Sequence, residues 1–461
     1  MTYPEALKYL DSFVNFEKTG EYNYKTSLKL DRMKRLAAFL GDPQDAVHSI
    51  HIAGSKGKGS TASYAHSILR HANLKVGLYT SPHLITFRER IRIGGELISE
   101  EDLSRILEDI KGILEASMKD DRPTFFEVYT AIAYIYFKEK KVDLAVYEAG
   151  LGGRLDATNL IKPLVSAITP ISYEHTDILG NTLREIAAEK CGIIKSDSIC
   201  VSAPQETEAL KTIKKICKDR SVRLILIGRD IKFKELESDE NLNIFDVEGT
   251  LEKYPGLKTK LIGRHQIVNA VTAIGIVEAL RLRNFQISSD AIRGGIEDAQ
   301  WEGRLEILGR SPLVVVDGAH NRASARALAD SVKRIFRSRR VKLIFGVSKD
   351  KDVNGMLEEL LPIANSIIFT KSKAAGRALD PALIEEIALK VHLAARRRAC
   401  VGGRASGVGE ALNRALADAG KEDMILITGS LFIVGEALQL LRARPATLGG
   451  ETCNDDMEMH D

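Results

Sequence analysis

A glycine-rich segment with two lysines carries the strongest chemical signal in the chain: Gly54-Ser55-Lys56-Gly57-Lys58-Gly59-Ser60. An apolar stretch, residues 49–53, comes directly before it, and a helical pattern over residues 61–71 follows. Glycines let backbone N–H groups converge on phosphate oxygens, and the start of a helix adds the positive end of its dipole. Lys58 is placed to reach the outer phosphates of a nucleotide, and Ser60 to approach a metal ion. The first glycine lies closer to the glycine–lysine pair than the general phosphate-loop pattern requires, so a plain turn with solvated lysines is the alternative. The flanking strand and helix favour phosphate binding.

Candidate metal ligands follow other apolar stretches. Glu148 ends one such stretch and precedes a glycine turn, Ser81 follows residues 75–80, and His175 follows residues 165–169. Ligands of open α/β sheets bind beyond the carboxyl ends of the strands, where a carboxylate can hold Mg²⁺ against phosphates. Each residue also has a plainer interpretation: a surface acid, a Ser-Pro turn and an ordinary hydrogen-bonding histidine. Lys190 lies late in a helical pattern, where a lysine complements the helix dipole, and the pattern gives it no special role.

The second half of the chain offers two strand-to-helix junctions, residues 317–321 and 427–430. Functional loops gather at such junctions, but helix capping by Asn321 or Ser430 is a strong alternative. No Ser-His-Asp set and no activated cysteine is evident in the sequence. Two lobes with loops of this kind, one of them bearing the phosphate loop, predict ATP bound in a cleft between them.

Short apolar stretches alternate with helix-length amphipathic ones along the chain. Stretches rich in Val, Ile and Leu are typical of strands buried on both faces, and their alternation with helices predicts a mostly parallel sheet flanked by helices. The predicted strands of the first half are residues 49–53, 75–80, 143–148, 165–169, 199–202 and 222–227, and the helices include residues 124–140 and 183–191.

A polar, turn-rich stretch, residues 230–262, breaks this rhythm and predicts a small antiparallel excursion. Helices from about His265 to Leu280 and over residues 288–297 follow it, the second capped by Ser288 or Ser289. A second series then begins, with predicted strands at residues 313–316, 342–346, 366–369 and 424–428. We therefore expect an ATP-binding domain over residues 1–298, a second α/β domain over 299–445 and a disordered tail over 446–461.

Composition is typical of a globular protein of a reducing compartment. The chain has 461 residues, 44% of them hydrophobic, which is ample for more than one core. A formal net charge of +3 gives no sign of a nucleic-acid or membrane-surface partner. Five widely spaced cysteines without a CxxC pair indicate neither a disulfide framework nor a zinc site. With no signal-peptide pattern at the N-terminus and no membrane-length apolar run, we expect a cytoplasmic protein.

A series of motifs occurs in order from about Tyr3 to Leu441. They are residues 54–60, 78–84, 87–91, 124–127, 148–159, 175–180, 189–195, 303–305, 317–321 and 427–430. Together they closely resemble the motifs of the folylpolyglutamate synthase/dihydrofolate synthase family, within the Mur ligase superfamily. Several ordered motifs are far harder to obtain by chance than one glycine loop.

The resemblance implies a fold, ligands and site residues. The fold is α/β, with a P-loop-type, mostly parallel sheet in the N-terminal domain and a smaller Rossmann-like C-terminal domain. ATP and Mg²⁺ are the implied cofactors, L-glutamate and dihydropteroate or a folate are the implied substrates, and we expect a monomer. The implied nucleotide contacts are Gly54, Gly57, Lys58, Gly59, Ser60, Asn269, Arg304 and Asp317, and the metal ligands are Ser81, Glu148 and His175. The implied acceptor segments are Thr124, Phe125, Phe126 and Glu127 with Leu155, Asp156 and Ala157, and looser candidates for the incoming glutamate are His320 and Ser430. The implied catalytic residues are Lys58, Glu148, His175 and Lys190, the last matching a family lysine that is carbamylated to help hold a second metal.

Departures from the family pattern are modest. Ser55 replaces the usual threonine, Lys56 stands where many members have asparagine, and Glu174 stands where aspartate is frequent. The first two leave the backbone of the phosphate loop intact. The stretch 391–407 follows no family pattern.

The expected reaction is ATP-dependent addition of L-glutamate to dihydropteroate, to folates or to both, through an acyl phosphate. One alternative is a muramyl-peptide ligase of the same superfamily, and another is a nucleotide-dependent switch built on the phosphate loop. The switch leaves residues 317–321 unexplained. A non-catalytic binding protein is a third alternative, and the intact Lys58, Ser81, Glu148 and His175 argue against it.

Overall fold

The computed structural model of the protein describes residues 1–19, 29–116, 118, 121–373, 376–394 and 400–443. The chain forms two compact units, Met1–Glu302 and Gly303–Asp461, which divide shortly after residue 298. The predicted disordered tail over residues 446–461 lies outside the described residues. None of the described helices combines the length and apolar character needed to cross a membrane.

The first unit is built round an eight-stranded sheet with the strand order β4-β3-β2-β5-β1-β6-β7-β8. Six of its strands are parallel, and β3 and β4 add an antiparallel edge beyond β2. The six parallel strands are those predicted from apolar stretches, with each end within one residue of the prediction. The strands are β1 (His48–Ala53), β2 (Val76–Tyr79), β3 (Ile91–Ile93), β4 (Glu96–Leu97), β5 (Leu144–Glu148), β6 (Val165–Ile168), β7 (Ile199–Ser202) and β8 (Arg223–Leu226).

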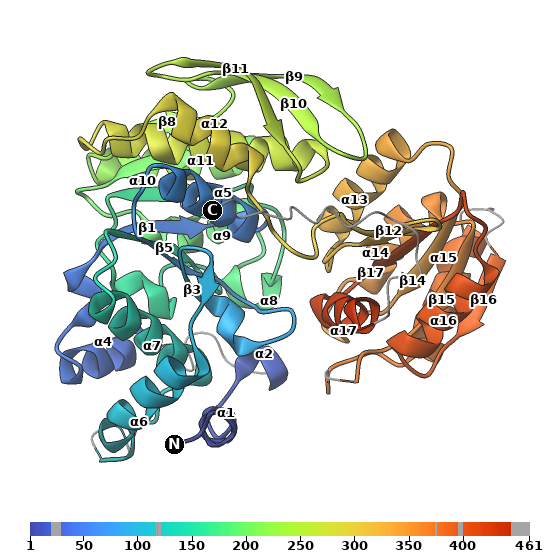
Figure 1. The fold of residues 1–461 in the computed structure, drawn as a ribbon, viewed down its shortest axis with the longest axis horizontal. Coiled ribbons are helices and arrows are strands. Elements are labelled where there is room, and N and C mark those ends of the chain that lie inside the picture. The colour runs from blue at the N-terminus through green and yellow to red at the C-terminus, as the bar shows by residue number, and fades with distance from the viewer. Residues whose placement is uncertain (20–28, 117, 119–120, 374–375, 395–399, 444–461) are drawn as a thin grey trace, which may run out of the picture. The chain divides into compact units, whose positions relative to one another are not determined.

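Helices cover both faces of this sheet (Figure 1). Successive residues of β5 show why: Leu144 and Val146 pack in one core, and Ala145 and Tyr147 pack in another on the opposite face. Both faces therefore need apolar side chains, which gives the strand its unbroken hydrophobic run. The helices and 3₁₀ turns are α1 (Tyr3–Asp11), α2 (Phe16–Thr19), α4 (Leu30–Phe39), η1 (Pro43–Ala46), α5 (Lys58–His71), η2 (Phe87–Arg90), α6 (Glu100–Ala116), α7 (Phe125–Glu139), η3 (Ala157–Leu160), α8 (Thr176–Leu179), α9 (Leu183–Lys190), η4 (Cys191–Ile193), α10 (Thr207–Asp219), α11 (Arg264–Arg281) and α12 (Ser289–Glu297).

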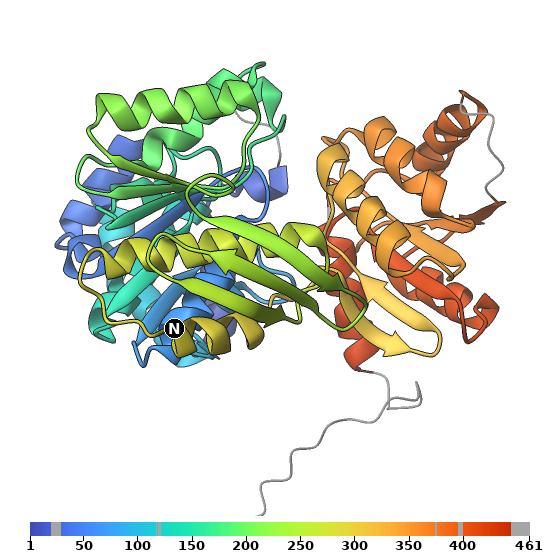
Figure 2. The ribbon, with the colours of Figure 1, turned by 90° about the horizontal axis from the view of Figure 1, so that it is seen from above.

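A three-stranded antiparallel sheet interrupts the parallel series, as the polar stretch 230–262 predicted. It runs alongside α11 and α12 (Figure 2). The Tyr64 hydroxyl of α5 lies 2.7 Å from the Thr259 hydroxyl, which ties this sheet to the helix after the phosphate loop. Its strands are β9 (Lys232–Ser238), β10 (Asn243–Glu248) and β11 (Lys253–Thr259).

The second unit has its own six-stranded sheet with the order β12-β13-β17-β14-β15-β16. The four central strands are those predicted, whereas both edge strands were missed. The edge strand β12 is partly exposed and has no continuous apolar run, and β16 contains two glycines. The elements are β12 (Glu306–Arg310), β13 (Leu313–Val316), α13 (Arg322–Ile335), β14 (Val341–Phe345), α14 (Val353–Leu360), η5 (Leu361–Ile363), β15 (Ser366–Phe369), α15 (Pro381–Ala394), β16 (Cys400–Arg404), α16 (Val408–Asp418), β17 (Met424–Thr428) and α17 (Leu431–Arg442).

Candidate active site

The phosphate loop joins β1 to α5, and the helix begins earlier than the sequence predicted. Its first residue is Lys58 rather than Thr61, and Gly57 takes the N-cap position with a φ of 78°. That left-handed conformation suits glycine, since a side chain would clash with its own backbone. No side chain of the described residues caps the helix, so the first N–H groups of α5 are left for an anion.

The loop is packed too tightly for larger residues at its glycines. A Cβ atom on Gly57 would lie 2.1 Å from Oδ1 of Asn269, and one on Gly59 would lie 2.6 Å from Cζ2 of Trp301. Asn269 is 4% exposed, and its Nδ2 donates to Oε1 of Gln266 at 3.0 Å. The predicted nucleotide contact Asn269 therefore lies directly against the phosphate loop, although the two are far apart in the sequence.

Four neighbouring strands bring the predicted residues of this unit together at the carboxyl-terminal end of the sheet. The order β2-β5-β1-β6 places Ser81, Glu148, the phosphate loop and His175 at or beyond the carboxyl ends of successive strands. The backbone N–H of Ser81 donates to Oε2 of Glu148 at 3.2 Å. The backbone N–H groups of Ser55 and Lys56 donate to the carbonyl of Pro170 at 3.0 and 3.3 Å, which joins the phosphate loop to the segment after β6.

Lys190 is buried beside the phosphate loop. Its side chain is 2% exposed, and Nζ donates to the carbonyl of Gly54 at 2.8 Å and to Oε1 of Glu174 at 2.6 Å. Nζ of Lys58 donates to the same Gly54 carbonyl at 3.2 Å. The interpretation of Lys190 as a helix-end lysine that complements the dipole does not account for these contacts, because its side chain is buried beside the phosphate loop. No local pattern revealed this, and only the family resemblance pointed to Lys190.

The charges of Lys190 and Glu174 affect each other's pKa values, and the charge of Lys58 affects both. Burial alone would raise the pKa of Glu174, but the positive charges of Lys190, Lys58 and His175, with the hydrogen bond from Lys190, lower it to about 2. Burial lowers the pKa of Lys190, and the carboxylate of Glu174 opposes that shift. Glu174, noted in the sequence only as a departure from the family pattern, is therefore an anion next to the phosphate loop.

The donor set at this edge fits a magnesium ion. Ser81 and Glu148 are joined by a hydrogen bond, and Glu148 is a carboxylate with only 5% exposure at the end of a strand. Mg²⁺ prefers oxygen donors and keeps waters and phosphate oxygens in its coordination shell, so it needs few protein ligands. Within the described residues, no three His, Cys, Asp or Glu side chains converge to hold a metal by themselves. Hydroxyl, carboxylate and imidazole from Ser81, Glu148 and His175 therefore suit an ion that nucleotide phosphates help to hold.

The predicted acceptor segment at the start of α7 is mostly buried. Thr124 is the N-cap of the helix, and its hydroxyl and backbone N–H both donate to Oε2 of Glu127, at 3.0 and 2.7 Å. Phe125 is fully buried and stacks on Tyr129 at 5.5 Å between ring centroids. Phe126 is only partly buried, in contrast to Thr124, Phe125 and Glu127, so a ligand would reach this segment most readily there.

The second predicted acceptor segment lies next to the first. A Cβ atom on Gly150 would lie 2.6 Å from Cζ of Phe126, so the ring rests against the glycine turn after β5. Asp156 is buried and accepts hydrogen bonds from the backbone N–H groups of Leu151 and Thr158, at 2.8 and 3.0 Å. Burial raises the pKa of the Asp156 carboxyl, and those hydrogen bonds oppose the rise. Asp156 thus shapes this turn, with Ala157 buried after it and Leu155 partly exposed before it.

In the second unit, Arg304 and Asp317 lie together. The carboxylate of Asp317 accepts hydrogen bonds from the N–H groups of Leu305 and Ala319, both at 2.9 Å. Burial raises its pKa, and the charge of Arg304 opposes the rise. A Cβ atom on Gly318 would lie 2.2 Å from Nη1 of Arg304, so the guanidinium occupies space that only a glycine at position 318 leaves open.

His320 and Ser430 follow two neighbouring strands of the second sheet, β13 and β17. Nδ1–H of His320 donates to the carbonyl of Gly318 at 2.8 Å. Asn321 caps α13 and Ser430 caps α17, so the capping alternative is confirmed for both. In that cap the hydroxyl oxygen of Ser430 accepts from the backbone N–H of Phe432 at 3.3 Å.

Known proteins match the chain along nearly its whole length. Family models match as the Mur ligase middle domain over residues 52–277 and as the Mur ligase, glutamate ligase domain over residues 303–431. A Bacillus subtilis dihydrofolate synthase/folylpolyglutamate synthase is 36% identical over 433 residues, which are 92% of this chain and 97% of the relative. Mycobacterium tuberculosis folylpolyglutamate synthase complexed with ADP has a TM-score of 0.85 and 31% identity, covering 96% of this chain and 99% of its own. E. coli FolC in complex with DHPP and ADP has a TM-score of 0.83 and 30% identity, covering 96% of this chain and 98% of its own.

The two domain models lie in the order expected of a Mur ligase, and a relative that is 36% identical is matched over nearly its whole length. The chain belongs to the folylpolyglutamate synthase/dihydrofolate synthase family of the Mur ligases.

Proposed function

We propose that this chain uses ATP and Mg²⁺ to join L-glutamate to the carboxylate of dihydropteroate, of folates, or of both. The observation that supports this most is the set of side chains at the ends of β2, β5, β1 and β6. There a phosphate loop with Lys58 lies beside the Ser81–Glu148 pair and the buried Lys190. Such a set suits a nucleotide triphosphate with its metal ion, and the family match gives the class of reaction.

The proposed reaction has two steps. A carboxylate oxygen of the acceptor attacks the γ-phosphorus of ATP, the bond to the bridging oxygen of ADP breaks, and an acyl phosphate forms. The amine of glutamate then attacks the acyl carbon, the amine loses a proton to solvent, and inorganic phosphate leaves. Lys58 and the N–H groups at the start of α5 stabilise charge on the phosphoryl oxygens. Bound Mg²⁺, held by Ser81, Glu148 and His175, would neutralise further charge on those oxygens.

We further propose that Lys190 acts as a carbamate. An amine must be neutral to add CO₂, and burial lowers the pKa of Lys190, which favours the neutral form. The product would place a second anion beside Glu174, and a divalent cation would neutralise the pair. A ¹³C carbonyl signal from labelled bicarbonate that disappears in Lys190→Arg would support this assignment, and an unchanged spectrum would contradict it.

For the substrates we propose two separate places. Phe126 and Leu155, beside the glycine turn after β5, would contact the ring system of the acceptor, with Asp156 shaping that turn. In the second unit, Arg304 and Asp317 would contact the nucleotide, and His320 with the start of α17 at Ser430 would contact the incoming glutamate. The E. coli FolC structure bound to DHPP and ADP supports a site of this kind.

An acceptor panel tests the function. Phosphate release is measured with ATP, Mg²⁺ and L-glutamate, in separate reactions with dihydropteroate, tetrahydrofolate and a muramyl-peptide acceptor. We expect release that needs both glutamate and a pteridine acceptor, and that stops when a chelator removes Mg²⁺. Activity with the muramyl peptide alone would instead indicate the cell-wall ligase, and hydrolysis indifferent to glutamate would indicate a nucleotide switch.

The chain is proposed to act as a monomer in the cytoplasm. Light scattering coupled to size-exclusion chromatography would give a mass near 50.8 kDa if this is right. A mass of twice that value would contradict the monomer.

A further inference from the structure

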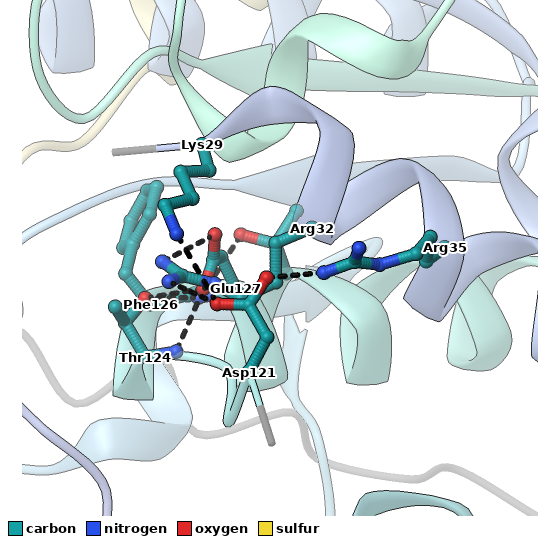
Figure 3. A network of polar contacts seen from close by, with 8 residues as sticks. Lys29, Arg32, Arg35, Asp121, Thr124, Phe126 and Glu127 are labelled. Atoms are coloured by element: carbon teal, nitrogen blue, oxygen red, sulfur yellow. Dashed lines mark hydrogen bonds and ion pairs between the residues drawn. The ribbon is translucent and has the colours of Figure 1, made fainter. Parts of the chain in front are cut away.

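A buried arginine, Arg32, joins two segments that are far apart in the sequence (Figure 3). It lies in α4, and its Nε and Nη2 donate to Oε2 and Oε1 of Glu127 at 2.8 and 3.0 Å. Two parallel hydrogen bonds of this kind fix the direction of the partner as well as its distance. The two side chains are 7% and 5% exposed, so solvent screens the pair little.

Glu127 is also the carboxylate that caps α7. Its Oε2 accepts hydrogen bonds from the backbone N–H and the hydroxyl of Thr124. With the two bonds from Arg32, Glu127 receives four, which leaves its side chain a single orientation. Arg32 thus reaches the first turn of α7 through Glu127.

The same capping pattern occurs elsewhere in the chain without such an arginine. The carboxylates of Glu5 at α1, Glu89 at η2 and Glu185 at α9 accept from their own capping segments. None of these three receives a hydrogen bond from an arginine side chain in the described parts of the chain. Helix capping therefore does not require a buried guanidinium. The presence of the Arg32–Glu127 pair at the start of α7 needs another explanation.

Stability does not supply that explanation. Burying two opposite charges costs about as much solvation as their attraction returns, so an apolar pair of similar size often serves as well. What the pair does add is a fixed geometry. Arg32 also lies 3.5 Å from Asp121 through Nη1, so its third nitrogen is engaged as well.

The Arg32–Glu127 pair fixes the position of Phe126. This residue lies in the first turn of α7, between Thr124 and Glu127, and its ring rests against Gly150. Phe125 before it is fully buried, whereas Phe126 is partly exposed. A shift or rotation of the helix start would therefore move the Phe126 ring relative to the glycine turn after β5.

We propose that Arg32 is a positioning residue for the acceptor. It holds the first turn of α7 so that Phe126 presents its ring to a flat, bicyclic, aromatic ligand. This inference rests on the proposed function, which places the acceptor beside Phe126. Arg32 acts through Glu127 and so governs acceptor binding rather than the chemistry of phosphoryl transfer.

The test compares Arg32→Met with Arg35→Met. Arg35 lies one turn further along α4 and also pairs with Asp121, but its side chain is 56% exposed. We expect Arg32→Met to raise the KM for the acceptor about tenfold or more, since small misplacements in a binding site have large effects. The KM for ATP and the KM for glutamate should stay within about twofold, and Arg35→Met should behave as the wild type. Arg32→Lys keeps the positive charge but cannot donate the two parallel hydrogen bonds to Glu127, and it should give an intermediate KM for the acceptor.

Specific results would overturn the inference. They are an acceptor KM unchanged in Arg32→Met and Arg32→Lys, equal rises in the KM values of ATP and acceptor, or the same rise in Arg35→Met. If Arg32→Met does not fold, Arg32→Lys carries the test, and an unchanged acceptor KM there is decisive. A wild-type protein that uses no pteridine acceptor would contradict the proposed function itself, and this would be seen before any variant is made.

Discussion

Lys58 is the single side chain on which the proposed chemistry depends most. Its Nζ and that of Lys190 approach the same carbonyl oxygen, that of Gly54, at 3.2 and 2.8 Å. Lys58 and the start of α5 thus place positive charge at the end of β1, whereas the charge of Lys190 is paired with that of Glu174. Such a concentration suits a triphosphate, whose charge the residues must balance as the γ-phosphoryl group moves.

Replacing Lys58 with alanine should leave the fold intact and nearly abolish turnover. Loss of a charge that stabilises the phosphoryl oxygens costs about a hundred- to a thousandfold in kcat. Lys56→Ala, in the same loop, is the matched control and should retain most activity, because the variant keeps the backbone N–H of Lys56 that donates to the carbonyl of Pro170. Glutamate-dependent ATP turnover near the wild-type rate in Lys58→Ala would refute the assignment.

His51, three residues before the phosphate loop, is a buried histidine with a defined tautomer. The Thr158 hydroxyl donates to Oδ1 of Asp156 at 2.5 Å, so it accepts from Nε2–H of His51 at 2.8 Å. Nδ1 of His51 is buried and has no hydrogen-bond partner among the described residues. Burial, with a smaller effect from the charge of Lys195, lowers the pKa of His51 to about 3.

This shift predicts a pH dependence of stability. The folded protein takes up a proton at His51 only near pH 3, whereas the unfolded chain does so near the ordinary pKa of about 6.5. Between these values the unfolded state binds more protons, so the free energy of unfolding falls as the pH drops. The slope that His51 contributes is about 1.4 kcal/mol per pH unit.

Chemical denaturation between pH 4.5 and 6.5, a range of about two units within that window, measures the slope. We expect His51→Gln to reduce it by about 1 kcal/mol per pH unit, since glutamine can keep the bond to Thr158 and does not titrate. His48→Gln, an exposed histidine at the start of the same strand, should leave the slope unchanged. Equal slopes in the wild type and His51→Gln would contradict the buried, neutral histidine.

At the scale of elements, the sequence predicted the buried strands well and the junctions less well. The parallel strands of the first sheet are short stretches rich in Val, Ile, Leu or Ala that pack on both faces, with exposed residues at some of their ends, such as His48 of β1 and Arg223 of β8. The start of α5 was predicted three residues too late because Gly59 lies in its first turn, and glycine is not typical of a helix. The edge strands β12 and β16 were missed because an edge strand lacks the continuous apolar run that marks a central one.

Two glycines in helices make a test of packing at the phosphate loop. Alanine stabilises a helix by about 1 kcal/mol relative to glycine. Within the described part of the chain, no atom lies within 4 Å of a Cβ added at Gly112 in α6, so Gly112→Ala should raise the free energy of unfolding. At Gly59 the Trp301 ring stands 2.6 Å from that Cβ, and overpacking of about 1–3 kcal/mol exceeds the gain in helix propensity.

Gly59→Ala should therefore weaken nucleotide binding about tenfold, because the first turn of α5 must move away from Trp301. Isothermal titration with ADP measures the change, and Gly112→Ala provides the control. ADP affinity equal to the wild type in Gly59→Ala would show that the ring moves instead of the loop.

At the scale of the whole molecule, the family and the class of site were predictable, but the assembly of the site was not. Lys190 and Glu174 form a buried pair against Gly54, yet neither stood out in the sequence. Their convergence depends on α9 turning its last residue inward, which no local spacing encodes. Thr124, Phe125 and Glu127 were expected to contact the acceptor, and the structure gives them capping and packing contacts that leave Phe126 reachable.

The measurement that tests the proposed acyl-phosphate reaction most directly follows one oxygen atom of the acceptor carboxylate. The acceptor is prepared with ¹⁸O in its carboxylate and incubated with the enzyme, ATP, Mg²⁺ and unlabelled L-glutamate. An acyl phosphate requires one carboxylate oxygen to leave with the phosphate, so we predict one ¹⁸O atom in each inorganic phosphate and one glutamate added per ADP. Amide product formed with unlabelled phosphate, or phosphate released without glutamate addition, would contradict the proposed ligase.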